Sequence, residues 1–385
     1  MKIINLVAGV SLAATMAMAD NVTLSKDGLG DFLIAPVYLA KGDVCTRVNV
    51  FNTNTTHSIL AKVAFREQLS SNEVDFPIFL SPGDVWSGTV CQENGDVVLT
   101  STDDSNHPKI KKLLENGKDI TAQSIKAGNN NVDFKTGYIE IYPVAEFAEG
   151  NTNKVDKDIL VDRWNMLIKG ETPSNLVKSG VDGYSLSGNV MFETKGNYYA
   201  TLPMTAFKGT HDKTLTGSAI AYGNDTGPDI LLGTNKKYQI LKQIQHNEAD
   251  FTYVNGGKDQ YVVFTYPFGY AKEQIRKYKV TVRDMEENKD QQKEEVVIFS
   301  PTPKIQPKAQ YMKNEVAVLS VENIIAQTQN PSMYKEGQIQ ITDITNITDV
   351  QLGAGKKASF LATYVTIKNG KDGNEVANAS YIPTK

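Results

Sequence analysis

Few residues in this chain combine types and spacing that could support catalysis. The 385 residues include two cysteines, Cys45 and Cys91, and four histidines. A catalytic cysteine needs a histidine partner, and no histidine falls in a recognisable Cys/His motif. The segment 183–188 (GYSLSG) approaches a nucleophile elbow, but its last glycine lies one position late. We therefore expect no enzyme activity. An unrecognised hydrolase is the alternative, because glycosidase chemistry needs only two carboxylates at a suitable separation.

The two cysteines predict a disulfide. Cys45 and Cys91 each lie in a segment of alternating polar and apolar residues. In an oxidising compartment such a pair forms a bridge, whereas two buried free thiols are the alternative. A bridge would close a loop of about 46 residues and stabilise the fold by about 4 kcal/mol through chain entropy.

Three segments carry enough oxygen ligands to raise the question of calcium: residues 156–162, 224–229 (NDTGPD) and 369–375 (NGKDGNE). Calcium prefers such hard oxygen donors. None of the three segments has the alternating acidic positions of an EF-hand loop, and ordinary turns are the favoured interpretation. We expect no cofactor, with calcium as the open alternative and its ligands unknown.

The N-terminus predicts export. Lys2 precedes an apolar run, Ile3–Ala14, and Ala17-Met18-Ala19 forms a cleavage motif before Asp20. This order of charge, apolar core and small residues is typical of a secretory signal peptide, here residues 1–19. No later stretch approaches the roughly 20 apolar residues of a spanning helix. The expected location is the cell surface or the extracellular space, with the periplasm as the alternative.

Composition and net charge limit the classes of partner that the chain is expected to bind. Hydrophobic residues make up 40% and charged residues 22% of the chain, as in ordinary globular proteins. The formal net charge of −4 gives no electrostatic footprint for a nucleic acid. We expect no nucleic-acid partner and no transmembrane segment.

Short strands separated by turn residues run along the first part of the chain. The sequence predicts strands at 31–40, 45–52, 59–67, 74–80, 85–91 and 97–102, with a short amphipathic helix at 108–116 and another strand at 137–144. Regular spacing of this kind is typical of an antiparallel sandwich. The expected first domain is an Ig-like β-sandwich of residues 20–147.

One predicted turn stands out, in the segment 76–91 (FPIFLSPGDVWSGTVC). Pro82 and Gly83 suit the centre of a type II turn, because proline presets φ and glycine accepts the positive φ that follows. Trp86 follows this turn. We interpret it as a core or edge anchor, with a ligand-stacking role as the alternative.

The second domain is predicted to span 148–385 as a β-rich region with a few short helices. Helical segments are expected at 159–168 and 236–245. Strands are expected at 185–194, 198–207, 260–267, 278–283, 295–299, 315–321, 338–344 and 359–368. No repeat of fixed period is evident, which argues against a solenoid or propeller.

The run from Cys45 to Asp104 resembles a group of uncharacterised exported bacterial surface proteins of proteobacterial type. Its pattern here is Thr46, the Asn52-Thr53 turn, Phe65-Arg66-Glu67, a Ser/Asn loop at 70–72, Asp75-Phe76, Leu80-Ser81-Pro82 and Asp84-Val85-Trp86. Weaker similarity extends to 137–140, 188–190, 198–207 and 262–267. Relatives of this type carry a cysteine near 102–106, where this chain has none. The resemblance implies a surface location and a β-rich fold, and it implies no activity.

These observations favour a structural role. A large exported chain without an anchor of its own is retained by self-association, by another surface component, or not at all. We favour retention, which suggests a subunit of a surface layer or extracellular filament. An adhesin or glycan-binding module is the alternative, with Tyr198-Tyr199 or the tyrosines at 266–270 as the exposed aromatics, unless these pack within strands.

The mature N-terminus is the candidate assembly element. Val22 and Leu24 alternate with polar residues as in a strand, and the segment 26–30 (KDGLG) after them reads as a hinge. Such a strand can fold back onto its own sheet, which we favour, or pair with the sheet edge of a neighbouring molecule.

Overall fold

The computed structural model describes most of the chain beyond the predicted signal peptide. The described residues are 22–68, 73–115, 134–150, 155–177, 186–194, 197–210, 214–221, 227–244, 247–269, 278–285, 296–297, 316–326, 328, 331–344, 360–370 and 373–382. The predicted cleavage site lies outside them.

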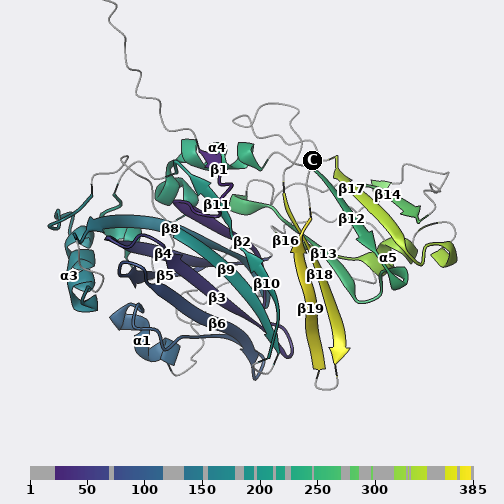
Figure 1. Ribbon diagram of the computed structural model, residues 1–385, viewed down its shortest axis with the longest axis horizontal. Helices are drawn as coiled ribbons and strands as arrows, with labels where there is room; N and C mark the ends of the chain where they lie inside the picture. Colours follow the sequence, from purple (N-terminus) through teal and green to yellow (C-terminus); the bar gives the residue numbers. More distant parts are fainter. Residues whose placement is uncertain are drawn as a thin grey trace, which may run out of the picture.

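The first unit is a β-sandwich of two antiparallel sheets (Figure 1). One sheet has the order β1 (Thr23–Leu24), β11 (Thr205–Lys208), β2 (Phe32–Leu39), β8 (Thr136–Ala148), β4 (His57–Glu67), β5 (Glu73–Leu80). The other has the order β10 (Asn197–Pro203), β9 (Leu186–Thr194), β3 (Val44–Asn52), β6 (Val85–Glu93), β7 (Asp96–Thr100). The inner faces meet in an apolar core, where the rings of Phe76 and Trp86 lie 5.6 Å apart. The mainly β, antiparallel fold predicted from the sequence is confirmed.

The predicted boundary at residue 147 does not match the sheet order. Strands β9, β10 and β11, all after residue 147, belong to the two sheets of the first unit. β9 pairs with β3 over nine residues, from Val44↔Thr194 to Asn52↔Leu186. Strand pattern alone does not reveal partners that are more than 130 residues apart in sequence, because side-chain alternation is the same whichever strand lies alongside.

The second unit contains two four-stranded sheets. The first has the order β12 (Glu248–Tyr253), β17 (Gly337–Asp343), β14 (Tyr278–Asp284), β15 (Val296–Val297). The second has the order β16 (Val316–Ser320), β13 (Gln260–Thr265), β18 (Leu361–Gly370), β19 (Gly373–Tyr381). This region follows the sandwich in the chain, and the β-rich second region predicted from the sequence is therefore present, although it begins later than expected.

Four short helices occur in the described part of the chain: α1 (Pro108–Glu115), α3 (Lys157–Ile168), α4 (Thr234–Gln243) and α5 (Val321–Ala326). The first three lie where the sequence predicts helices. α3 begins at an N-cap, Asp156, whose side chain accepts a hydrogen bond from the Asp158 amide at 3.0 Å. This cap satisfies one of the amides that a helix leaves unpaired at its start.

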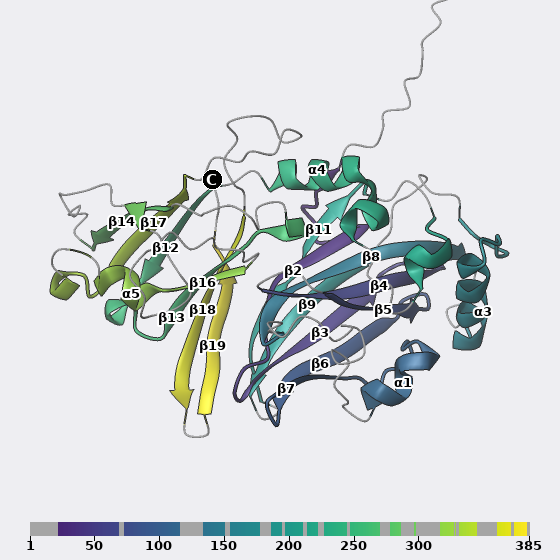
Figure 2. The ribbon, with the colours of Figure 1, turned by 180° about the vertical axis from the view of Figure 1, so that it is seen from behind.

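The two units pack against each other. Figures 1 and 2 place the β18–β19 hairpin beside β10 of the sandwich. The Tyr381 hydroxyl donates to the Pro203 carbonyl at 2.6 Å, and the Tyr138 hydroxyl accepts from the Phe268 amide at 3.2 Å. The buried hydrophobic residues of both units form one contiguous cluster. The second unit is thus anchored to the sandwich by apolar contacts and by polar contacts, of which the one between Phe268 and Tyr138 is buried.

Candidate functional site

The predicted disulfide is confirmed. Cys45 and Cys91 are bonded, with their Cα atoms 4.5 Å apart. Their strands, β3 and β6, are neighbours in the five-stranded sheet, where Thr46 pairs with Val90. The bridge therefore links two adjacent strands that are already held together by backbone hydrogen bonds.

The predicted turn is also confirmed. The Asp84 amide donates to the Ser81 carbonyl at 3.2 Å, and Gly83 has φ of +70° at the third position of this turn. The Asp84 side chain accepts from the Ser81 amide at 3.0 Å. Trp86 is fully buried, which agrees with the predicted anchor role. It is therefore no ligand-stacking platform.

The candidate assembly strand folds back onto its own sheet. Thr23 and Leu24 pair with Lys208 and Phe207 of β11. Val22 is buried, its amide donates to Gln239 Oε1 at 3.0 Å, and Leu24 is 44% exposed. The fold-back arrangement favoured from the sequence is the one present, and Leu24 contributes little to the core.

Among the described residues, a group of six buried ionisable side chains lies on the outer face of the six-stranded sheet. It consists of Lys62 and Arg66 from β4, Glu73 and Asp75 from β5, and Glu140 and Tyr142 from β8, and we call it the buried charge cluster. All six side chains are at most 7% exposed.

Strand register explains why these residues meet. Alternate residues of a strand share a face, so Lys62, Ala64 and Arg66 of β4 line up on the side opposite the Phe65 ring. In the neighbouring strands Arg66 pairs with Glu73 and Tyr138, Ala64 with Asp75 and Glu140, and Lys62 with Pro77 and Tyr142. The two cations therefore flank a small residue, with carboxylates on both sides.

Each charge in this cluster has an oppositely charged neighbour. Lys62 Nζ lies 2.7 Å from Asp75 Oδ2, and an Arg66 terminal nitrogen (NH2) lies 2.5 Å from Glu73 Oε2. Arg66 Nε also donates to Glu140 Oε2. That same oxygen accepts from the Tyr142 hydroxyl at 2.6 Å. Lys62 Nζ donates in addition to the Ala219 carbonyl at 3.4 Å, so the 3-10 turn Gly217–Ile220 covers this part of the sheet.

Burial and charge act in opposite directions on these groups. Burial raises the pKa of Asp75 above its ordinary value, against the opposing effects of Lys62, Glu73 and Arg66. Burial likewise raises the pKa of Tyr142, and the neighbouring Glu140 raises it further. Burial lowers the pKa of Arg66, but Glu140 and its other neighbours outweigh this, and the pKa of Arg66 lies well above its usual range. Arg66 therefore stays charged. Asp75 takes up a proton more readily at this position than it would in water.

The cluster as a whole carries more acid than base. Three carboxyl groups, Glu73, Asp75 and Glu140, face two cations, Lys62 and Arg66. Burying unpaired charge is costly, so one proton held among the carboxyls would lower the free energy of the folded state. Chemically, the cluster can hold strands together and can move protons over short distances.

No sequence motif singles out this cluster as a site. Arg66 and Asp75 belong to the motif that carries the family resemblance, and the structure gives them a shared position. The available signal was Lys62 and Arg66 inside an otherwise apolar strand, ILAKVAFRE. Charged residues are rarely fully buried unless they are paired.

The other chemical candidates gain no support from the described residues. No group of three or more His, Cys, Asp or Glu residues within the described ranges could hold a metal ion. In the first oxygen-rich segment Asp156 serves as a helix cap, and half of 224–229 and part of 369–375 lie outside the described residues. Of the near-elbow at 183–188, the described residues 186–188 lie in β9.

The proposed binding aromatics are only partly described. Tyr266 is fully buried and donates to Asp343 Oδ2 at 2.9 Å, which removes it as a surface platform. The side chains of Tyr198 and Tyr199 and the residue Tyr270 lie outside what the structure describes.

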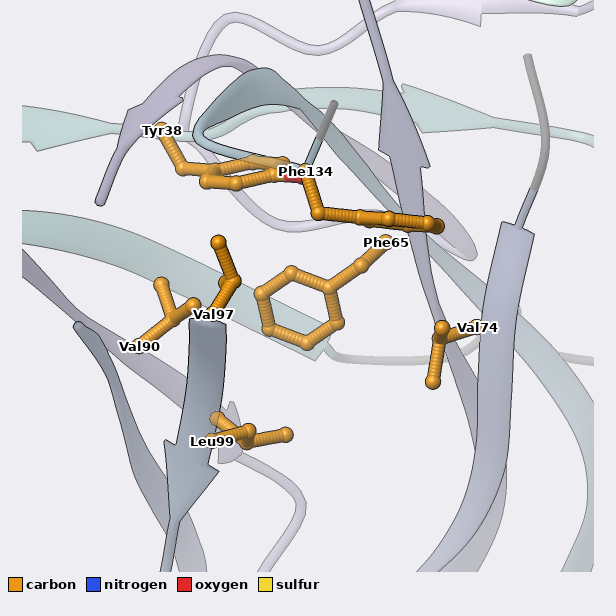
Figure 3. Close-up of a pocket in the computed structure, with 7 residues that line it drawn as sticks. All are labelled: Tyr38, Phe65, Val74, Val90, Val97, Leu99 and Phe134. Atoms are coloured by element: carbon orange, nitrogen blue, oxygen red, sulfur yellow. The ribbon is translucent and has the colours of Figure 1, made fainter. Parts of the chain in front are cut away.

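A small apolar pocket opens between the edges of the sandwich. Figure 3 shows the Phe65 ring at the centre of the pocket, with Tyr38 and Phe134 above it and aliphatic side chains of β5, β6 and β7 around it. The lining residues are Tyr38, Phe65, Val74, Val90, Val97, Leu99 and Phe134. The space between them is about 260 Å³ including the part open to solvent. Room for a molecule inside it is limited to about one water. It is too small for a sugar or cofactor.

Comparison with known proteins gives no match to any family model, to any curated protein or to any solved structure. Among the described residues, no helix is long and apolar enough to cross a membrane. The class of protein is therefore defined by the fold alone: a two-part, mainly β protein with a cross-strand disulfide and a buried charge cluster.

Proposed function

We propose that this protein is a non-enzymatic structural subunit of the bacterial cell surface, exported and retained by association with itself or with another surface component. The observation that carries the proposal is where the reactive side chains lie and what they join. In the described residues, the cysteines and the densest group of acids and bases join neighbouring strands of the sandwich.

Burial supports this interpretation. A catalytic group must be reached by substrate, whereas Lys62, Asp75 and Glu140 lie within the protein, at most 5% exposed. A pocket on the opposite face of this sheet, lined by Phe65 and Val74 among others, is apolar and has room for about one water. Charged side chains that are buried and join neighbouring strands favour a protein that must keep its shape outside the cell.

Open sheet edges supply a means of association. Among the described strands, β7 pairs only with β6, and β12 pairs only with β17. An edge strand presents unpaired amide and carbonyl groups that a strand of another molecule can bind. A head-to-tail contact of this kind extends into a fibre or lattice unless its rotation closes a ring.

Electron microscopy of the purified mature protein, residues 20–385, tests the proposal. We expect fibres or two-dimensional lattices at high protein concentration, measured with and without calcium so that the open question of a metal is answered in the same experiment. Monodisperse particles under all conditions, together with binding on a glycan array, would instead support the adhesin alternative. Hydrolysis of a panel of glycoside and ester substrates would contradict the non-enzymatic assignment.

A further inference from the structure

We propose that Lys62 and Asp75 become joined by an isopeptide bond, a covalent amide between the two side chains that cross-links β4 to β5. The two reacting groups are already in contact, since Lys62 Nζ lies 2.7 Å from Asp75 Oδ2. Their side chains are 0% and 3% exposed. This modification is independent of the proposed surface role and would also serve a protein with another function.

The register of the sheet keeps the Lys62 and Asp75 side chains next to each other, which favours a reaction between them. Lys62 lies opposite Pro77 of β5, and Asp75 lies opposite Ala64 of β4, so the two residues are diagonal neighbours on one face. Ala64 lies between Lys62 and Arg66 on this face, and its small side chain leaves room for the Lys62 side chain to lie along the sheet. Well-oriented reacting groups in one molecule can reach effective concentrations of about 10⁵–10⁸ M.

The reaction is balanced without any co-reactant. The amine nitrogen of Lys62 attacks the carboxyl carbon Cγ of Asp75, a C–N bond forms, and a C–O bond breaks. One oxygen leaves as water, with hydrogens that came from the ammonium and, in the neutral pair, from the carboxylic acid. Starting from the ion pair, –NH₃⁺ and –COO⁻ give –NH–CO– and H₂O, so no oxidant, reductant or external proton is required.

The surroundings favour the neutral reactants. A proton must move from Lys62 to Asp75 before attack, since only a free amine is a nucleophile. Burial raises the pKa of Asp75, which favours its protonated form. Glu73, two residues away on the same face of β5 and 7% exposed, interacts with the Asp75 carboxyl and could exchange a proton with its leaving oxygen.

The product is better suited to this position than the ion pair. Two ions removed from water retain a large desolvation cost even when they are paired. An amide is neutral, so its formation removes both buried charges from a cluster in which carboxyls outnumber cations. Arg66 would keep its two partners, Glu73 and Glu140.

Intact mass spectrometry of the purified, reduced and denatured mature protein tests the bond directly. We expect a mass about 18 Da below the sequence mass, the loss of one water. Tryptic digestion should give a branched peptide that joins residues 48–66, uncleaved after Lys62, to residues 67–109. A wild-type mass equal to the sequence mass, with separate tryptic peptides, would overturn the proposal.

Two variants provide matched controls. Lys62→Arg keeps the positive charge but lacks the primary amine, so it should retain the full sequence mass. Asp75→Ala removes the acceptor carbon and should do the same, and either variant is measured denatured so that loss of folding does not obscure the result. A loss of water that persists in Lys62→Arg lies at another site and would contradict the assignment.

Glu73→Gln examines the proton carrier separately. We expect a smaller linked fraction in this variant at equal time after expression, read from the two intact masses. An unchanged linked fraction would overturn the role of Glu73 in the reaction.

Discussion

The indole N–H of Trp86 donates a hydrogen bond to Asn106 Oδ1 at 2.8 Å, with both residues buried. Asn106 in turn donates to the Ser101 carbonyl and hydroxyl, at 3.2 and 3.1 Å. The tryptophan after the Pro82-Gly83 turn is thereby tied to the segment that follows β7.

Replacing Asn106 should test this link. Asn106→Ala leaves the Trp86 donor buried without its partner, and we expect a loss of about 1–3 kcal/mol in the free energy of unfolding. Asn165→Ala, at an exposed position of α3, is the matched control and should change stability by less than about 0.5 kcal/mol. Chemical denaturation followed by tryptophan fluorescence measures both. Equal stability of the two variants would contradict the role of Asn106.

Gly83 should resist substitution because of its backbone and not because of crowding. A Cβ at this position would meet no atom within 4 Å, but φ is +70°. We expect Gly83→Ala to destabilise the protein by about 1–2 kcal/mol, the cost of the left-handed conformation for an L-residue.

The control for this substitution is Gly227→Ala, where a Cβ also meets nothing within 4 Å and φ is not positive. It should be neutral or slightly stabilising, because alanine reduces the freedom of the unfolded chain. Thermal melts of the two variants give the comparison. A Gly83→Ala variant that melts at or above wild type would remove the type II assignment.

Removing the disulfide should weaken the sandwich without changing its topology. The double variant Cys45→Ser/Cys91→Ser is expected to lose about 2–4 kcal/mol of unfolding free energy. The two strands already pair through backbone hydrogen bonds, so circular dichroism should keep its β signature. Wild type in reductant provides the same comparison without substitution, and stability unaffected by either treatment would argue against a structural role of the bridge.

The N-terminal strand should contribute to stability more than to assembly. Deletion of residues 20–27 removes the buried Val22 side chain and the β1–β11 pairing. We expect a loss of about 1.5–3 kcal/mol, the value of burying one such side chain. Any fibres or lattices should form as with the full-length mature protein. Loss of assembly with stability unchanged would instead show that this segment connects subunits.

Alkaline pH should reveal a contribution from Tyr253. Burial raises the pKa of Tyr253 from 10.0 to about 12, with Tyr334 and Asp284 acting in the same direction. Between these values the unfolded chain loses a proton that the folded protein keeps. Stability conferred by this group is therefore complete below pH 10 and falls as pH rises towards 12. Tyr253→Phe should show a shallower decrease in unfolding free energy over this range, measured against wild type at pH 7 and above pH 10. Parallel pH curves would contradict the assignment.

The sequence by itself determined the local structure of this protein. The apolar run at 31–40, the alternation along 85–91, the Pro82-Gly83 pair and the helical pattern at 159–168 are local signals, and the strands, turn and helix lie where those signals predict. The disulfide could also be predicted, because a chain with two cysteines allows a single intramolecular pairing.

Tertiary structure decided which distant residues became neighbours. The sequence does not show that β9 pairs with β3, or that Glu140 of β8 meets Arg66 of β4, because a strand pattern specifies a face and not a partner. The buried charge cluster exists because the register of β5, β4 and β8 places three carboxyls around two cations beneath later segments of the chain. The strand pattern at 59–67 places Lys62 on one face of a strand but does not show what covers that face. Only the cover supplied by residues far along the sequence makes it a buried amine in contact with Asp75.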